Sequence, residues 1–474
     1  MNMKNSHVGL LLALLALSTI LDGLDASIVS VALPTISHEL GVSVGDSSWI
    51  TLTYVIALAA LLLPMAKFAR NGTVKRVFAW GIAIFTISSV ACGISGDFVA
   101  LVFFRLVQGI GAALMTAAVP VLISQFLPAD KKGLGMGVLA VASGVSVVIG
   151  PSVGGIITSM LDWRWIFLIN IPFGIIAVAL TFKVLPKDEG YDKSRNPDLL
   201  NSILAVFGIG AGMVCLQNLV GSAMPMVSVA VCGIVGVVFI AVMAYRMLKY
   251  PDFALISPEM LKRRDFQLLS IAFTMTCMVI MGTQYVLPYF LQIFGKFTVA
   301  ESGYLLSVAS IFAIVLSVPV GKWCDTRGCK LPSVLAGVGR LIFCIIFIIV
   351  VPSEDTALLL IGLAIMGCSM AFAGTGLATA LIHHADTENQ TDAATFLLEV
   401  NYVAASLGVT LYSAIFQSGL GSASVSTITA DAINSSADTA MIVGCVLSVI
   451  AIICTVSVKN IVPKKDDSET PSEN

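Results

Sequence analysis

The stretch VGLLLALLALSTILDGLDASIVSVAL, residues 8–33, is almost wholly apolar but contains two acidic residues, Asp22 and Asp25. An α-helix of about 20 apolar residues, rising ~1.5 Å per residue, crosses the ~30 Å hydrocarbon core of a bilayer. The stretch therefore predicts a membrane-spanning helix. It is too long for a signal-peptide core and lacks a convincing cleavage site, so we expect it to be retained.

The rest of the chain has the same character. Of its 474 residues, 57% are hydrophobic and 11% are charged, and the mean hydropathy is +0.97. Soluble domains carry about 25% charged residues, so the composition excludes an ordinary soluble domain and predicts an all-α membrane protein. Fourteen stretches are long and apolar enough to be transmembrane helices: 8–33, 48–66, 77–95, 98–127, 134–159, 165–185, 199–219, 226–248, 267–293, 302–320, 331–351, 356–382, 392–417 and 437–458.

The basic residues predict the orientation of these spans. An even number of spans places both termini on one side, and Lys and Arg concentrate in cytoplasmic loops. With cytoplasmic termini, only Arg164 and Lys296 of the 26 basic residues fall on the outer side, while Arg105 and Arg340 lie within spans. We therefore expect a multi-pass protein of the cell membrane with both termini in the cytoplasm.

Two polar stretches, 187–198 and 250–265, divide the spans into groups of six, two and six. Internally repeated transporters place two pseudo-symmetric bundles around a site near the bilayer midplane. The expected organisation is a six-helix N-terminal bundle, a two-helix insertion with its linkers, a six-helix C-terminal bundle and a disordered polar tail, over residues 1–190, 191–264, 265–460 and 461–474 respectively.

Ionisable side chains within spans cost about 2.5–3.5 kcal/mol each on insertion scales, so each is a candidate functional group. Asp22 and Asp25 are one helical turn apart and share a face, and counting from Val8 places both in the outer half of the span. Arg105 reaches a similar depth to Asp25, so we expect the two to pair, either for proton coupling or only to fix helix packing. Beside a like charge in a poor solvent, Asp22 is expected to hold a proton near neutral pH.

In the second half, Glu399 and Arg340 lie at similar depths. They form either a buried ion pair with each other, or Glu399 lines the transport cavity and takes part in proton movement. Several polar residues within spans are candidates to line that cavity, although most of them are equally suited to bonding between helices. They are Gln108, Gln284, Tyr285, Tyr289, Gln292 and Asn401.

Ordered short motifs carry a family resemblance. They are LDASIVSVALP at 24–34, RLVQGIGAA at 105–113, GPSVGG at 150–155, WRWIFLINIPFG at 163–174, LPYFLQ at 287–292 and GKWCDTRGCK at 321–330. In this order the motifs resemble those of the major facilitator superfamily, and with fourteen spans they resemble its drug:proton antiporter family. The resemblance implies export by alternating access, with Asp25 as a coupling or cation-sensing group.

Two of these motifs imply conformational roles. Pro151 removes a backbone donor and kinks its helix, while Gly150, Gly154 and Gly155 permit close helix approach; the family resemblance makes this the antiporter motif. The inner-loop motif comprises Gly321, Asp325, Arg327 and Gly328, whose Asp is expected to latch one conformation. The corresponding first-half loop departs from the family pattern, with Asn71 near where an Asp is expected.

The resulting functional prediction is a proton-coupled exporter of small lipophilic compounds, cationic or neutral, that acts as a monomer in the lipid bilayer and binds no nucleic acid. A narrower exporter of a metabolite, peptide or amino acid on the same fold is the alternative. No phosphate-binding Gly-rich loop, metal-ligand cluster or Ser/His/Asp constellation lies at membrane depth, so we expect no cofactor, no metal site and no enzymatic activity.

Overall fold

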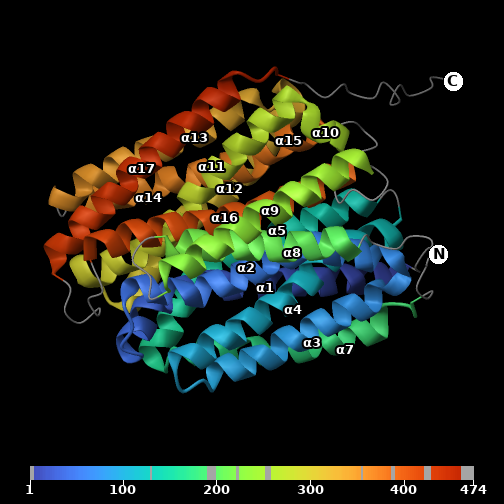
Figure 1. Cartoon of the computed structure of the whole chain (residues 1–474), viewed down its shortest axis with the longest axis horizontal. Coiled ribbons are helices and arrows are strands. Elements are labelled where there is room, and N and C mark those ends of the chain that lie inside the picture. The colour runs from blue at the N-terminus through green and yellow to red at the C-terminus, as the bar shows by residue number, and fades with distance from the viewer. Residues whose placement is uncertain are drawn as a thin grey trace.

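The structure, a computed structural model, describes residues 5–128, 131–188, 199–219, 224–250, 258–353, 356–385, 390–420 and 429–460. The tail 461–474 and parts of both polar stretches between the helix groups lie outside the described residues. All regular elements within the described ranges are helices (Figure 1).

The first half comprises α1 to α7. Their bounds are α1 Asn5–Glu39, α2 Val44–Phe68, α3 Val74–Gly93, α4 Phe98–Phe126, α5 Lys132–Met160, α6 Trp165–Leu168 and α7 Asn170–Val184, with the π-helical segment η1 Ala69–Thr73 between α2 and α3. The inserted pair is α8 Leu199–Asn218 and α9 Met226–Lys249.

The second half follows from α10 onward. Its helices are α10 Pro258–Lys262, α11 Arg264–Tyr289, α12 Val299–Arg327, α13 Lys330–Ser353, α14 Thr356–Ala371, α15 Ala378–His383, α16 Gln390–Leu420 and α17 Ala430–Val456. Two further π-helical segments, η5 Phe290–Phe294 and η6 Phe372–Leu377, extend α11 and join α14 to α15.

Thirteen helical stretches of the described chain are long and apolar enough to cross a membrane. One of them, Val44–Gly93, is 50 residues long and contains both α2 and α3. Asn71 and Gly72 leave helical geometry at the junction, and Gly72 has φ 83°, a conformation that glycine adopts without steric cost. The fourteen-span count stays a prediction, and this break marks the place where α2 and α3 separate.

The two halves pack side by side, and Figure 1 shows the first half in blue to teal and the second in yellow to red. The halves meet along two seams, where α5 packs on α12 and α2 packs on α16. Helix α8 contacts both α2 and α16, so the inserted pair covers the second seam.

Outward-facing side chains are apolar along the spans. Val227, Ile234 and Val237 of α9 are 75%, 64% and 69% exposed. Apolar surface of this extent is abnormal in water and suits lipid. The polar side chains described next face the interior.

Both chain ends lie at one end of the helical array in Figure 1; we refer to it as the terminal end and to the other as the distal end. Helix α1 runs from Asn5 at the terminal end to Glu39 at the distal end. Asp22 is therefore the midpoint of α1. The expectation that it lies in the outer half of its span stays a prediction, because the helix continues six residues beyond Leu33.

Candidate functional site

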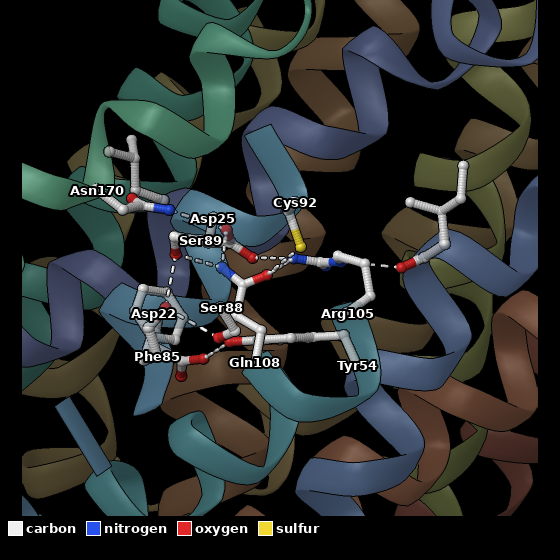
Figure 2. A network of polar contacts seen from close by, with 12 residues as sticks. Asp22, Asp25, Tyr54, Phe85, Ser88, Ser89, Cys92, Arg105, Gln108 and Asn170 are labelled. Atoms are coloured by element: carbon white, nitrogen blue, oxygen red, sulfur yellow. Dashed lines mark hydrogen bonds and ion pairs between the residues drawn. The ribbon is translucent and has the colours of Figure 1, made fainter. Parts of the chain in front are cut away.

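A buried polar network surrounds Asp25 (Figure 2). Arg105 Nη1 of α4 lies 2.5 Å from Asp25 Oδ2, with both side chains fully buried. Gln108 Nε2 and Asn170 Nδ2 donate to the other oxygen, Oδ1, over 2.8 and 3.0 Å. The predicted pairing of Asp25 with Arg105 is confirmed. Because both oxygens accept charge-assisted or amide hydrogen bonds, the carboxylate is neutralised within the first half of the molecule.

The spacing of α4 positions two of these groups. Arg105 and Gln108 are three residues apart and so share a helix face, and Arg105 Nη1 also donates to Gln108 Oε1 over 2.7 Å. Arg105 Nε donates to the Ile50 carbonyl of α2 over 3.0 Å, and Gln108 Nε2 donates to Ser89 of α3 over 2.8 Å. Gln108, predicted to line the cavity, is fully buried and instead joins three helices around Asp25.

Asp22, one turn away, has a different environment. Its oxygens accept hydrogen bonds from the hydroxyls of Tyr54 in α2, Tyr402 in α16 and Thr116 in α4; the Tyr402 bond is 2.9 Å and the Thr116 bond 3.4 Å. Among the described residues, no cation pairs with it. Tyr402 belongs to the second half of the chain, so Asp22 is held by both halves.

Tyr54 connects the two acids. Its hydroxyl donates to Asp22, while its ring lies 4.4 Å from the Arg105 guanidinium, which is itself bonded to Asp25. A guanidinium over an aromatic face is a favourable cation–π contact. The Phe167 ring also faces this guanidinium, at 5.6 Å. Asp22 and Asp25 therefore differ in their partners but share Tyr54 as a neighbour.

Glu399 and Arg340 are both buried, with exposures of 5% and 0%. The three guanidinium nitrogens of Arg340 and both carboxyl oxygens of Glu399 make no hydrogen bond within the described part of the chain. The predicted alternative of an ion pair between them is therefore wrong. Glu399 faces the main chain of Leu63 in α2 across the seam, whereas Arg340 faces Cys277, Cys344 and Tyr412 inside the second half.

Three predicted cavity residues bridge the halves at the distal end. The hydroxyl of Tyr289 lies 2.8 Å from that of Ser37 and 2.6 Å from that of Ser47. Tyr285 donates to the Val44 carbonyl, and Gln292 donates to the Val31 carbonyl over 2.9 Å. In this conformation these side chains join α11 and its extension η5 to α1 and α2 at the distal end.

The remaining two predicted cavity residues are Asn401 and Gln284. Asn401 accepts a hydrogen bond from the Cys277 thiol over 3.5 Å, so it joins α16 to α11. Gln284 of α11 is partly buried. At the terminal end, a small pocket opens between α2, α4 and α16, lined by residues that include Ala66, Thr116 and Thr395.

The glycines of the GPSVGG motif face two different helices. A side chain at Gly150 would meet Ser27 of α1 at 1.8 Å, and one at Gly154 would meet the Ile28 carbonyl at 3.0 Å. A side chain at Gly155 would instead lie 2.7 Å from the Val299 carbonyl of α12. The motif therefore packs α5 on α1 through one face and on the second half through the other.

Pro151 lies on the same seam. Its carbonyl would be 2.3 Å from any side chain at Gly303 of α12. The Ser152 and Ser307 hydroxyls, 2.7 Å apart, join the two helices across it. Small residues thus let the halves touch backbone to backbone.

The inner-loop motif ends α12. Gly321 is loosely packed, and Gly328, at φ 84°, ends the helix that reaches Arg327. Asn460 holds this turn, because its Nδ2 donates to the Arg327 carbonyl over 3.1 Å and its Oδ1 accepts from the Lys330 amide over 3.2 Å. Asp325 is exposed and makes no ion pair among the described residues, so the expected latch is not formed in this conformation.

In the first half, an acidic residue from beyond α7 lies at the N-terminus of α3, just after the loop that contains Asn71. Asp188, which follows α7, accepts from the Lys75 and Arg76 amides over 2.9 and 3.2 Å and lies 3.5 Å from Arg76 Nε. An acidic group at a helix N-terminus satisfies its free amides and its dipole. This contact could not be predicted from the sequence, because Asp188 lies 113 residues along the chain from Lys75.

Sequence reasoning also missed Tyr54, Tyr402, Thr116 and Asn170 as site residues. Asn170 lies inside the WRWIFLINIPFG motif and was its one buried amide, which is the signal that could have identified it. The tyrosines carried no such signal, since a tyrosine in a span is equally suited to the membrane interface.

Comparisons with known proteins agree with this architecture. The sequence model of the Major Facilitator Superfamily matches residues 15–409. The riboflavin transporter RibZ of Clostridioides difficile is 24% identical over 413 residues, covering 87% of this chain and 89% of RibZ. The multidrug export protein EmrB of Escherichia coli (strain K12) is 29% identical over 318 residues, covering 65% of this chain and 60% of EmrB.

The fatty acid resistance protein FarB of Neisseria gonorrhoeae is 31% identical over 317 residues, covering 65% of this chain and 61% of FarB. Among solved structures, an inward-facing bacterial homologue of the human lysosomal transporter Spinster has the same fold, with a TM-score of 0.70 at 16% identity over 96% of this chain and 97% of that one. The chain therefore belongs to the Major Facilitator Superfamily and is a multi-pass membrane transporter with EmrB-like relatives.

Proposed function

We propose that the protein is a proton-coupled exporter of small lipophilic compounds, cationic or neutral, which works as a monomer in the cell membrane with both termini in the cytoplasm. Asp22 carries this proposal, because it is a carboxylate at the midpoint of α1 that has hydroxyl partners from both halves and no cation among the described residues. Such an acid binds and releases a proton more readily than one fixed by a guanidinium.

In this proposal, the movement of the two halves during alternating access couples proton binding at Asp22 to transport. Tyr54 and Thr116 belong to the same half as Asp22, while Tyr402 belongs to the other. When one half rotates against the other, the Tyr402 bond is the contact that breaks. Loss of one donor to a carboxylate favours the protonated form, so proton uptake follows from the movement itself. Asp25, whose donors all belong to its own half, keeps its partners throughout.

The charges of the interior support the substrate class. Asp22 and Glu399 have no cationic partner in the described chain, and Glu399 lies at the α2–α16 seam. Acids at a seam attract cations and tolerate neutral compounds. The matches to relatives named for multidrug export and for fatty acid resistance extend over about two thirds of this chain, which supports export of small lipophilic compounds as the proposed activity.

A narrower metabolite exporter is the second candidate. The match to RibZ, a riboflavin transporter, extends over 87% of this chain, more than the matches to EmrB and FarB. Riboflavin is a neutral aromatic compound, so the same interior suits it. Competition in one assay separates the two candidates, since only a broad exporter transports unrelated compounds.

The test uses purified protein in proteoliposomes with an imposed pH gradient, and tetraphenylphosphonium and riboflavin as probes. Asp22→Asn should abolish accumulation against a gradient while exchange of probe across the membrane continues. The amide has the size of the carboxyl group, and its NH2 group can donate to a hydroxyl oxygen instead of accepting from it, but it cannot carry a proton. The control is Asp431→Asn, an exposed acid at the distal end of α17. Gradient-driven transport by Asp22→Asn at the wild-type rate would refute the assignment.

A further inference from the structure

Arg340 of α13 is a fully buried cation near the middle of its helix. None of its Nε, Nη1 and Nη2 atoms has a hydrogen-bond partner in the described chain. The side chains close enough to interact with it electrostatically are Cys277, Cys344 and Tyr412, none of which is an acid. A buried guanidinium stays charged, and removing it from water without a counter-charge costs more than a single hydrogen bond returns.

Two hydroxyl groups in this region of the described chain are further donors without a hydrogen-bond partner. Tyr412 of α16 is fully buried, and its hydroxyl has no hydrogen-bond partner of ordinary geometry. Thr283 of α11 faces this hydroxyl and is equally buried and unpartnered. Three helices thus direct a guanidinium and two hydroxyls toward one region of the second half.

Glycine keeps this region free of one more side chain. A Cβ atom at Gly444 of α17 would lie 2.7 Å from the Tyr412 hydroxyl and 2.9 Å from the Cys344 sulfur. Water could accept hydrogen bonds there, but it does not neutralise the charge. A small anion accepts from all three donors and also supplies the negative charge.

We propose that Arg340, Tyr412 and Thr283 form an anion site inside the second half, which takes a small monovalent anion, either chloride from solution or the carboxylate of an amphiphilic substrate. The site is separate from Asp22 and Asp25, whose partners come from α2, α4, α7 and α16. The proposal concerns binding alone, so it is independent of proton coupling; a substrate carboxylate at this site would extend the substrate class beyond the cationic and neutral compounds proposed above.

The experiment is a thermal melt of the purified full chain in nanodiscs, starting in gluconate and titrated with chloride or with octanoate. The wild type should be stabilised in a saturable way, by roughly 3–5 °C at a hundredfold excess over the dissociation constant. Arg340→Met, which fills the space without charge, should lose the dependence. The matched control is Lys322→Met, an exposed cation of the same half.

Tyr412→Phe provides a second variant if Arg340→Met does not fold. It keeps the ring and removes one donor, so the apparent dissociation constant should rise about 5–10-fold. Stabilisation by chloride alone identifies the solution anion; stabilisation by octanoate, together with its transport, identifies a substrate carboxylate. A wild-type melt that is indifferent to both anions, or equal stabilisation of Arg340→Met and the wild type, would overturn the proposal.

Discussion

Replacing Asp25 by Asn tests whether the buried network is an ion pair or an arrangement of neutral hydrogen bonds. Both Asp25 oxygens accept: Oδ2 from Arg105, and Oδ1 from Gln108 and Asn170. An amide offers only one acceptor. If its oxygen faces Arg105, its NH2 group points at two other donors, and if it is flipped, the NH2 group points at the guanidinium.

The magnitude follows from this geometry. Removing one partner of a fully buried pair leaves the other charge uncompensated, which costs about 3–5 kcal/mol. Asn170→Ala removes the charge-assisted hydrogen bond from Asn170 Nδ2 to Asp25 and should cost about 1.5–3 kcal/mol. Asn170 Oδ1 makes no hydrogen bond in the described chain, so no further bond is lost. The double variant Asp25→Asn with Arg105→Gln should be less costly than the sum of the two singles, by about 0.5–3 kcal/mol.

The assay is reversible unfolding in mixed micelles, with the free energy of unfolding obtained for the wild type, both singles and the double. The Asp97→Asn variant is the control, because Asp97 is an exposed N-cap of α4 and its amide can still accept from the helix. An Asp25→Asn cost under about 1 kcal/mol would contradict the calculation, because it would mean that Arg105 is neutralised by another route.

Three further perturbations test separate contacts. Gly155→Ala places a methyl group 2.7 Å from the Val299 carbonyl and should slow transport by separating α5 from α12, while Gly137→Ala on the same helix, where nothing lies within 4 Å, should leave the rate unchanged; equal rates for both would exclude the seam. Tyr289→Phe removes the hydroxyl that bonds to Ser37 and Ser47 at the distal end, which should cost about 1–2 kcal/mol. Maleimide labelling of a Val44→Cys reporter in a cysteine-free background should therefore increase about 5–30-fold. The control Tyr304→Phe, at an exposed tyrosine, should not change the labelling. Asn460→Ala should accelerate amide exchange around Gly328 by releasing the Arg327 carbonyl and the Lys330 amide, and the adjacent Lys459→Ala should not; unchanged exchange in Asn460→Ala would mean that the turn is held by its own backbone.

The sequence predicted well what depends on position along a helix axis. Residue depth placed Asp25 beside Arg105, and the structure joins them. Equal depth also suggested that Glu399 meets Arg340, but depth says nothing about direction around the helix. Glu399 faces α2 across the seam, while Arg340 faces the interior of its own half.

The polar residues of α11 at the distal end are a second case in which position along a helix did not predict the contact. Tyr285, Tyr289 and Gln292 recur at intervals of four and three residues, which places them on one face of α11 and its extension. The sequence analysis took these residues only as polar side chains within spans, and their spacing adds that they share a face. The spacing does not show whether this face lines a cavity or meets Ser37 and Ser47, because that depends on how the two halves are placed in a given conformation.

The two acids of α1 differ in how they would respond to a movement of the halves. Every side-chain partner of Asp25 comes from α4 or α7 in its own half, so rotation of one half against the other leaves that charge paired. Asp22 takes one of its three hydroxyl donors from α16, and Tyr54 links it to the Arg105 guanidinium. The proton coupling we propose requires one buried charge to stay constant while another changes its protonation, and this division of partners would allow it. The constant pair would fix the position of Tyr54, and the donor from the other half would make the affinity of Asp22 for a proton depend on conformation.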